Sequence, residues 1–302
     1  MKEIGYTKPL FILAFDHRAS FSRDLLAVAG EPTAEEVPQI QQLKGIIFSG
    51  FKQAVAKDIP KAAAAILIDE QYGSAIIAEA KSQGINFVLS VEKSGQAEFT
   101  LEYGGDFAEH INKFNPPFVK ALVRYNPAGD AELNKRQLDK LKKFSGWCSN
   151  QPYKFLIELL VPATAEQLAK VKGDKSRFDL ELRPGLTVGA VKNILAGGVK
   201  ADIWKIEGMD ETENYRALAR VIKAAGQAKV NMVVLGRGEN TKHMAGWLKA
   251  AQGVDGVIGF AIGRTIFWEP LKSYLAGKLS ADQASTQISK NYTRFYKFFT
   301  NK

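Results

Sequence analysis

The stretch ADIWKIEG at residues 201–208 places charged side chains inside an otherwise apolar segment. Its apolar residues have the composition of a buried β-strand, yet Lys205 lies at its centre and Glu207 follows two positions later. Lysine is rarely buried without a partner, because removing its ammonium from water is costly. Side chains alternate between the two faces of a strand, so we expect Lys205 and Glu207 to point the same way.

A lysine in such a strand suits covalent chemistry on a carbonyl compound. Burial disfavours the ammonium form, and a neutral amine attacks a ketone to form a Schiff base. The protonated imine then accepts electrons when a carbon–carbon bond breaks. A carboxylate such as Glu158, in FLIEL, would move the proton on the hydroxyl that becomes an aldehyde. We therefore expect Lys205 to form an imine, with Lys120 as a second lysine nearby.

Eight short apolar runs, most ending in a polar or glycine-bearing turn, recur along the chain. They begin at Leu10, Ala64, Asn86, Phe118, Lys154, Ala201, Asn231 and Gly256. Segments with helical spacing lie between several of them, at 75–81, 133–144, 188–195, 215–225 and 243–250. Eight alternations over roughly 250 residues predict a (β/α)₈ TIM barrel of the α/β class, with a doubly wound open sheet as the alternative.

No linker-like stretch divides the chain, so we expect one domain over residues 1–302. Two additions to the barrel are predicted: an insertion at 22–60 after the first strand, and a C-terminal helix. This helix carries an aromatic stripe that we expect to pack on the barrel, namely Tyr292, Phe295, Tyr296 and Phe299.

Ionisable residues lie within or just past the carboxyl-terminal half of several predicted strands, namely Asp16, Asp69, Glu92, Arg124, Glu158 and Lys205. That end of a barrel carries the active site, where inward side chains converge. A structural cluster of ion pairs is the alternative. Buried pairs contribute little net stability, which favours a functional site.

The last two predicted strands end in glycine-rich turns that each contain an arginine, LGRGEN at 235–240 and GFAIGRT at 259–265. Loops after the seventh and eighth strands, together with a helix N-terminus, form the common phosphate site of such barrels. The arginines would add charge-assisted hydrogen bonds. We expect a phosphate site from Gly236, Arg237, Gly238, Gly263 and Arg264.

The composition bounds the class of protein. The net charge of +9 suits an anionic partner, but the basic residues are spread along the chain and no nucleic-acid motif occurs. No apolar run is long enough for a membrane span, and we expect no signal peptide. A single cysteine fits a reducing cytoplasm. The three histidines lack metal-ligand spacing, so we expect neither a metal nor another cofactor, and only His17 looks functional.

The ordered set FDHR, IDEQYG, SVEKSG, VKALVRY, FLIEL, DIWKIE and GFAIGRTIFW resembles the strand ends of class I tagatose 1,6-bisphosphate aldolases, which are Schiff-base TIM barrels. PLFILAFDHRASF and IGFAIGRTIFWEPL are similar to the domain often fused to 5-dehydro-2-deoxygluconokinase in myo-inositol catabolism, here without the kinase. The resemblance implies a Schiff-base role for Lys205 and proton transfer by Glu158. It also implies that Lys120 and Asp16 are active-site partners.

Two departures from the tagatose pattern bear on the substrate. His17 replaces a glutamine, and Arg124 stands where an uncharged aromatic residue is usual. An extra arginine suits a carboxylate, so we expect 2-deoxy-5-keto-gluconate 6-phosphate, a phosphorylated keto-sugar acid, to be cleaved to dihydroxyacetone phosphate and malonate semialdehyde. Arg124, Arg18 and His17 would bind the far end of this substrate, and Glu92 is a further expected substrate-binding residue. Related aldolases for a sulfosugar phosphate or a ketose bisphosphate are alternatives, as is a non-catalytic sugar-phosphate-binding protein. A homo-oligomer is compatible with the sequence.

Overall fold

The computed structural model describes residues 3–301, and its strands close into one parallel barrel. The strands follow one another around the barrel in chain order, and β8 pairs with β1. Their bounds are β1 Leu10–Ala14, β2 Ala64–Asp69, β3 Asn86–Ser90, β4 Phe118–Arg124, β5 Lys154–Leu160, β6 Ile203–Glu207, β7 Asn231–Leu235 and β8 Val257–Ile262. The predicted (β/α)₈ barrel is confirmed. Residues 1, 2 and 302 of the predicted domain lie outside the described residues.

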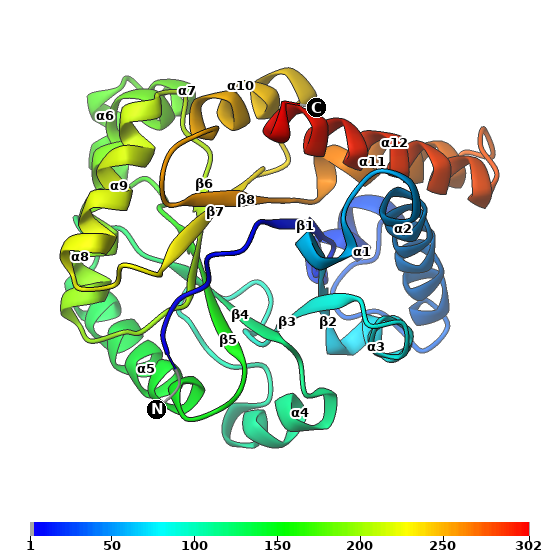
Figure 1. The fold of residues 1–302 in the computed structure, drawn as a ribbon, viewed down its shortest axis with the longest axis horizontal. Helices are drawn as coiled ribbons and strands as arrows, with labels where there is room; N and C mark the ends of the chain where they lie inside the picture. The colour runs from blue at the N-terminus through cyan, green and yellow to red at the C-terminus, as the bar shows by residue number, and fades with distance from the viewer. Residues whose placement is uncertain (1–2, 302) are drawn as a thin grey trace.

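Helices surround the barrel on its outside (Figure 1). The α-helices are α1 Ala19–Leu26, α2 Val37–Lys57, α3 Glu70–Ser82, α4 Phe107–Phe114, α5 Ala131–Ser149, α6 Ala165–Lys170, α7 Lys175–Arg177, α8 Arg183–Ala196, α9 Thr212–Ala224, α10 Thr241–Ala251, α11 Arg264–Leu275 and α12 Ala281–Thr300. Short 3₁₀ turns occur at η1 Lys61–Ala63 and η2 Gly104–Asp106, and η3 Phe178–Leu182 is a π-helical turn.

The five predicted helical segments fall within α3, α5, α8, α9 and α10, with one difference of a single residue at the end of α9. Asn240 caps α10, because its Oδ1 accepts a hydrogen bond from the backbone N–H of His243 at 3.0 Å. The helices that the periodicity did not indicate are mostly short. They include α6 and α7, which have too few turns for an apolar stripe to repeat.

The interior of the barrel is apolar toward the amino ends of the strands. Its buried side chains come from all eight strands and form one cluster: Leu10, Ile12, Ala14, Ala65, Leu67, Val88, Phe118, Leu156, Ile203, Val233 and Ala261. Tyr6 packs edge-to-face on Phe118, so the N-terminal segment covers this end of the barrel. A larger apolar cluster fills the space between the strands and the surrounding helices. The interior of the barrel is therefore closed by apolar side chains at its amino end.

The predicted insertion and C-terminal helix lie against each other. Helix α2 forms most of the 22–60 insertion and packs on α12 (Figure 1, blue and red). The aromatic stripe of α12 packs as predicted, since Tyr292 Oη donates to the carbonyl of Phe11 at 2.6 Å and Tyr296 contacts the Phe11 ring edge-to-face. These contacts join both additions to the barrel as one unit.

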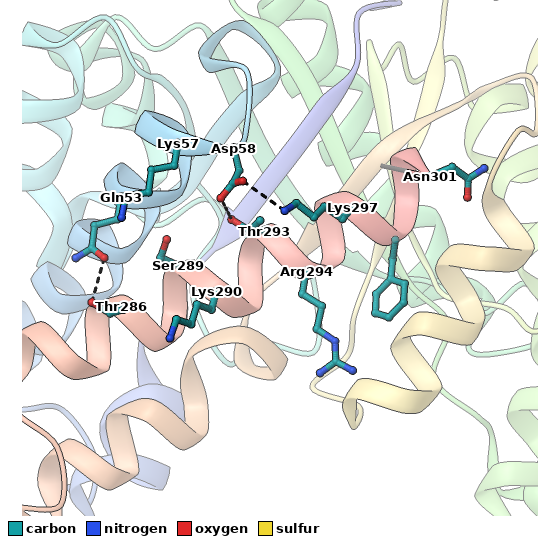
Figure 2. Close-up of a pocket in the computed structure, with 11 residues that line it drawn as sticks. Gln53, Lys57, Asp58, Thr286, Ser289, Lys290, Thr293, Arg294, Lys297 and Asn301 are labelled. Carbon is teal, nitrogen blue, oxygen red and sulfur yellow. Dashed lines mark hydrogen bonds and ion pairs between the residues drawn. The ribbon is translucent and has the colours of Figure 1, made fainter.

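A cavity of about 810 Å³ lies between α2 and α12, outside the barrel. Its side chains largely bond one another: Thr286 donates to Gln53, and Asp58 accepts from Thr293 and pairs with Lys297 at 3.4 Å (Figure 2). These interactions link two helices and converge on no common point. Within residues 3–301, no helix combines the length and apolar character needed to cross a membrane.

Candidate active site

A second cavity, of about 780 Å³, opens at the carboxyl ends of the strands. It contains the site predicted from the sequence. Every residue expected to act on or bind the substrate lines it, namely Asp16, His17, Arg18, Glu92, Lys120, Arg124, Glu158, Lys205, Gly236, Arg237, Gly238, Gly263 and Arg264. Residues from seven strands and the loops that follow them therefore meet in one place, as the barrel geometry requires.

Lys120 is the centre of a buried ionic cluster. It lies on β4, is 2% exposed, and has three carboxylates around its ammonium. Its Nζ is 2.8 Å from Asp16 Oδ2, 2.7 Å from Glu92 Oε1 and 2.9 Å from Glu158 Oε2. Burial opposes the charged form, but Asp16, Glu158 and Glu92 outweigh it and raise the pKa of Lys120 above its usual value. Lys120 is thus held as a fixed cation.

Glu158 joins the two lysines. It is the register partner of Lys205 on the neighbouring strand, so both side chains leave the barrel wall at the same height. Glu158 Oε1 is 2.8 Å from Lys205 Nζ, while Oε2 faces Lys120. Burial would raise the pKa of Glu158, but Lys120 and Lys205 together lower it. A carboxylate in direct contact with a candidate amine nucleophile is the arrangement that proton transfer requires.

Lys205 is 5% exposed, and its amine faces the cavity. Among residues 3–301, Glu158 is the one carboxylate within ion-pair distance of Lys205. Glu207 also lines the cavity, so the two charges share a face as expected, yet they do not pair. Instead Glu207 accepts a hydrogen bond from the backbone N–H of Val161 at 2.8 Å and pairs with Arg237 at 3.2 Å. Lys205 thus has a single anionic partner, whereas Lys120 has three.

Asp16 lies two residues past the end of β1 and contributes the third carboxylate of the cluster. Burial alone would raise its pKa, but Lys120 and Lys205 lower it below its usual range. The next two residues also line the cavity. Arg18 binds Glu92, through its backbone carbonyl at 2.6 Å and its carboxylate at 3.4 Å, and Glu102 at 2.8 Å. Arg18 therefore fixes the position of Glu92, and part of its donor capacity is already used.

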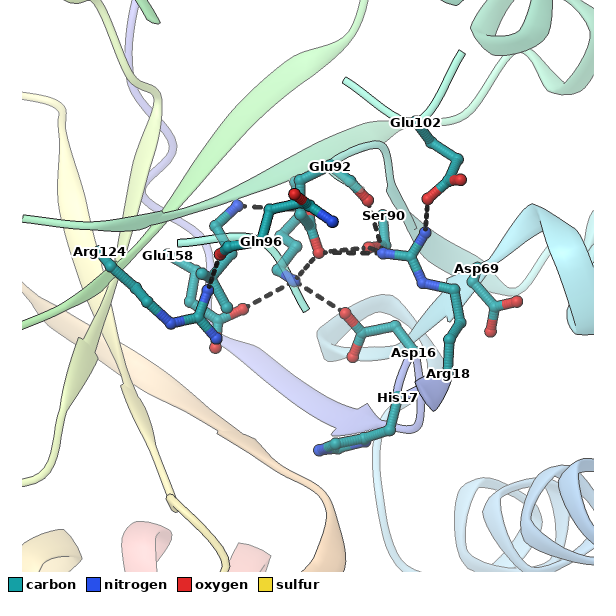
Figure 3. Close-up of polar contacts among 12 residues, drawn as sticks. Asp16, His17, Arg18, Asp69, Ser90, Glu92, Gln96, Glu102, Arg124 and Glu158 are labelled. Atoms are coloured by element: carbon teal, nitrogen blue, oxygen red, sulfur yellow. Dashed lines mark hydrogen bonds and ion pairs between the residues drawn. The ribbon is translucent and has the colours of Figure 1, made fainter. Parts of the chain in front are cut away.

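Arg124 lies apart from the cluster, on the opposite side from Arg18 (Figure 3). It is half-buried at the end of β4, and its Nη1 donates to the backbone carbonyl of Gln96 at 2.7 Å. An ion pair with Glu158 or Glu92 would give this arginine a purely structural role. Within residues 3–301 no such ion pair is present. Its guanidinium has four further N–H donors. Arg124 can therefore accept an anion at the rim while still holding the loop that carries Gln96.

The loops after β7 and β8 form a corner on the other side of the cavity. Gly263 caps α11, and a Cβ there would lie 2.3 Å from the carbonyl oxygen of Ala14, so only glycine fits. Gly238 has a φ of +82°, and a Cβ there would lie 2.8 Å from the Arg264 guanidinium. Arg264 Nη2 in turn donates to the carbonyl of Arg237 at 2.8 Å. The glycines thus allow an arginine and the start of a helix to approach each other closely.

Arg237 lines the same corner, but its guanidinium is engaged by carboxylates. Nη1 is 2.8 Å from Asp179 Oδ2, and Nε is 3.2 Å from Glu207 Oε1. Its backbone is left-handed, with a φ of +49°, which is unusual for a residue other than glycine. Arg237 thus connects the loop after β7 with the segment between β5 and α8. Of the two arginines predicted for the phosphate, Arg264 is the one without a carboxylate partner in the described chain.

His17 is half-buried, and its ring lies edge-on to Phe267. Burial lowers its pKa to about 4, and the cations Arg264, Lys205 and Lys44 act in the same direction against Asp16. The ring is therefore neutral near pH 7. Nδ1 is buried and has no hydrogen-bond partner among residues 3–301.

The sequence reasoning missed residues on the segment between β5 and α8. Lys175, Phe178 and Asp179 line the cavity, and they belong to α7 and the π-helical turn η3. Lys93 and Arg23 also reach its edge. The one signal in the sequence was the unusual length of the 161–182 stretch, which has no apolar period. Single-turn π-helices occur frequently at functional sites.

Among residues 3–301, no group of three or more His, Cys, Asp or Glu side chains is arranged so that it could hold a metal ion. The acidic side chains of the cluster surround a lysine instead. The donor set is thus one of amines and carboxylates.

Residues 5–302 match the family described as "Uncharacterized protein conserved in bacteria (DUF2090)". The chain belongs to this family. The match extends over the strands and loops that form the cavity, so the site is part of what the DUF2090 family model spans.

Several curated relatives have an aldolase name. The DUF2090 chain is 27% identical to the tagatose 1,6-diphosphate aldolase of Listeria monocytogenes serotype 4a over 200 residues, which are 65% of this chain and 54% of that protein. It is 25% identical to tagatose 1,6-diphosphate aldolase 2 of Streptococcus pyogenes serotype M1 over 187 residues, or 58% and 54%. The chain thus spans about half the length of the curated relatives it matches. The predicted resemblance to tagatose aldolases is confirmed as a distant similarity.

The crystal structure of Cgl0159 from Corynebacterium glutamicum has a similar fold. It superposes with a TM-score of 0.56 at 18% identity, covering 97% of the DUF2090 chain and 88% of that chain. This likeness supports the barrel over nearly the whole chain.

Proposed function

We propose that this protein is a class I aldolase that cleaves a phosphorylated keto-sugar through a Schiff base on Lys205. The observation that carries the proposal is the contact between Lys205 and Glu158, at 2.8 Å, on adjacent strands facing one cavity. A nucleophilic amine and a proton-transfer carboxylate are the two groups that this chemistry needs. The distant similarity to proteins named tagatose 1,6-diphosphate aldolase supports the same class of reaction.

In the proposed reaction the Lys205 amine adds to the ketone carbon, and loss of water gives a protonated imine. The bond between the α-carbon and the hydroxyl-bearing β-carbon then breaks, and its electron pair moves toward the imine to give an enamine. The hydroxyl on the departing carbon loses its proton and becomes an aldehyde. Protonation of the enamine and hydrolysis of the imine return the water, release the ketone product and free the amine.

Glu158 is the proposed base at two points of this sequence. Its contact with Lys205 Nζ allows it to take the ammonium proton before attack and to return that proton to the hydroxyl that leaves as water. The carboxylate is then free to take the proton of the substrate hydroxyl when the carbon–carbon bond breaks. Lys120 stays charged and holds Glu158 from the other side. Asp16 completes the ring of charges around Lys120 and faces the same cavity. We therefore propose that Lys120 and Asp16 fix the position of the Glu158 carboxylate and keep it ionised.

The corner after β7 and β8 is the proposed phosphate site. Arg264 lacks a carboxylate partner among residues 3–301, and it is the first residue of α11. The first N–H groups of a helix precede its internal hydrogen bonds, which begin in α11 with Ile266 donating to the carbonyl of Gly263. Gly236, Gly238 and Gly263 leave room for a phosphate to approach the backbone. Arg237 would act less directly, because its guanidinium already binds two carboxylates.

The proposed substrate is 2-deoxy-5-keto-gluconate 6-phosphate, the keto-sugar acid of myo-inositol catabolism. Its ketone lies beside the phosphate-bearing carbon, and cleavage between carbons 3 and 4 gives dihydroxyacetone phosphate and malonate semialdehyde. With the phosphate at Arg264, the carboxylate would extend toward Arg124, which has donors to spare at the rim. A planar guanidinium suits a carboxylate with two parallel hydrogen bonds. Neutral His17 would add one hydrogen bond.

A ketose 1,6-bisphosphate is the second candidate. The relatives named tagatose 1,6-diphosphate aldolase favour it, and Arg124 would then hold the second phosphate. A sulfosugar phosphate would use the same rim arginine. A purely binding function is the least favoured, because it gives no role to the Lys205–Glu158 contact.

The substrates are distinguished by kcat/KM for the keto-sugar acid phosphate and for tagatose and fructose 1,6-bisphosphate in the wild type, Arg124→Lys and Arg124→Ala. We expect the wild type to prefer the acid. Both variants should narrow that preference by roughly tenfold, since a lysine cannot reproduce the planar fork. Equal or better cleavage of a bisphosphate by the wild type would select the second candidate. Cleavage of none of the three would exclude both candidates and leave a sulfosugar phosphate as the aldolase substrate to test.

A fall in both activities alike would mean that Arg124 only holds the loop at Gln96. The ratio of the two kcat/KM values is therefore the quantity to compare, and thermal unfolding of each variant shows whether the rim has loosened.

A further inference from the structure

Lys44 is fully buried on α2, a helix of the insertion, and points at the start of the active site. Its Nζ donates to the carbonyl of Phe15 at 2.9 Å and to the carbonyl of His17 at 3.1 Å. Its third hydrogen bond goes to Asp69, with which it forms an ion pair. An ammonium has three protons, so all of its donor capacity is used at this point. Lys44 does not line the cavity.

The two carbonyls that Lys44 binds lie on either side of Asp16. At this point the chain has left β1, whose last residue is Ala14, and α1 starts only at Ala19. Residue 18 has a φ of −116° and a ψ of −89°, outside helix and strand geometry, and no side chain caps α1. Backbone carbonyls in such a stretch do not take part in the hydrogen bonds of a helix or a sheet, and a buried carbonyl needs another hydrogen-bond donor. Lys44 supplies them.

The same short stretch carries three side chains of the site. Asp16 binds Lys120, His17 faces the cavity, and Arg18 holds Glu92. The position of all three depends on the backbone that Lys44 holds at both ends of Asp16. Asp69 completes the arrangement, because its other oxygen accepts the backbone N–H of Tyr72 and caps α3. The ion pair thus ties α2, β2 and the catalytic stretch together.

We propose that Lys44 is a positioning residue for the active site, acting through the carbonyls of Phe15 and His17 on the placement of Asp16. This assignment rests on the proposed aldolase function. Lys44 touches no substrate. This positioning role would make the insertion between β1 and β2 part of the functional machinery, because the helix that carries Lys44 belongs to that insertion.

The test is the double variant Lys44→Met with Asp69→Asn, which removes both buried charges together and retains an asparagine cap. A matched control exists at the other end of the barrel. There Lys154 pairs with buried Asp202 at 3.0 Å and donates to the carbonyl of Glu3 at 2.8 Å. The control is Lys154→Met with Asp202→Asn. We expect kcat to fall at least tenfold in the first variant with KM within threefold, and both constants to stay within twofold in the control.

A second readout does not depend on activity. The chain has three histidines, so the ring resonances of His17 can be assigned by their loss in His17→Gln. They should shift in the Lys44 variant and stay in place in the Lys154 control. Unchanged resonances and kcat, or equal effects in both double variants, would overturn the proposal. A shift without any aldolase activity in the wild type would refute the proposed function and leave the positioning role standing.

Asp69→Asn alone decides the matter if the double variant does not fold. It leaves Lys44 able to donate to both carbonyls, so the loss of kcat and the shift of the His17 resonances should be smaller than those expected of the double variant. A tenfold loss of kcat in this single variant would overturn positioning through the carbonyls and assign the effect to Asp69.

Discussion

The two ends of the barrel both contain contacts between a lysine and a buried carboxylate, but they use them differently. At the amino end, Asp202 accepts backbone N–H groups from Gly5 and Phe155 as well as the Lys154 ammonium. At the carboxyl end, the carboxylates of the cluster bind mainly lysine and arginine side chains around an open cavity. Saturation by the backbone marks a structural contact. Side-chain charges facing a cavity mark a group available to a ligand.

The change occurs along single strands. On β4 the inward side chains run from Phe118 through Lys120 to Arg124, and on β5 from Leu156 to Glu158. The amino end of each strand contributes to the apolar interior, and the carboxyl end contributes charge. Breaking an ion pair that includes a buried group is costly at either end, so a loss of stability does not distinguish a functional contact from a structural one. A loss of kcat does distinguish them.

The largest expected difference in kcat is between the variants Glu158→Gln and Asp202→Asn. Glutamine keeps the shape of Glu158 but cannot take a proton, so we expect kcat to fall by about 10²–10⁴-fold. Asp202→Asn should leave kcat within twofold and lower the free energy of unfolding by roughly 1–3 kcal/mol. Steady-state kinetics and chemical denaturation of both variants measure this. Similar kcat values in the two variants would remove the functional distinction between the ends.

Arg264→Ala probes the phosphate corner, with a smaller expected effect. Loss of a charge-assisted hydrogen bond to a phosphate costs roughly 1.5–3 kcal/mol, so KM for phosphorylated substrates should rise by about one to two powers of ten. Arg220→Ala is a suitable control, because this arginine is 65% exposed on α9 and pairs with Glu213. A KM that does not change in Arg264→Ala would place the phosphate elsewhere in the cavity.

The fold and the cavity lining were predictable because their signals are local. A buried strand shows as an apolar run, and charges at Lys120, Glu158 and Lys205 interrupt such runs at positions that a barrel brings together. The order of strands around the barrel follows from chain order. The positions of the strands, and the alternation of side chains between their two faces, were enough to predict that these charges share one site.

The partners within the site were not predictable, since they depend on distances between strands. The sequence placed Glu207 beside Lys205, whereas the barrel pairs Lys205 with Glu158 and turns Glu207 toward Arg237. Lys44 had no signal at all, because a lysine on a helix is normally solvated. Its role depends on where a long insertion packs against the barrel, which no local pattern specifies.

The smallest expected effect concerns pH and His17. Its pKa is lowered from 6.5 to about 4 in the folded protein, so the unfolded chain takes up a proton there at higher pH than the folded one. This contribution to stability is present above pH 6.5 and is lost as the pH falls toward 4. His17→Gln should flatten that part of the stability curve and leave its slope above pH 7 unchanged. Denaturation midpoints between pH 8 and pH 4 measure it, and parallel curves for the two proteins would contradict the assignment.

The most direct measurement is covalent trapping of the imine. Dihydroxyacetone phosphate and sodium borohydride are added to the wild type, Lys205→Met and Lys154→Met, and the labelled peptide is identified by mass spectrometry. Borohydride reduces an imine irreversibly, so the nucleophilic lysine keeps the adduct. We predict an adduct on Lys205 in the wild type and in Lys154→Met, and none in Lys205→Met. An adduct on Lys120, or no adduct in the wild type, would contradict the Schiff-base role of Lys205.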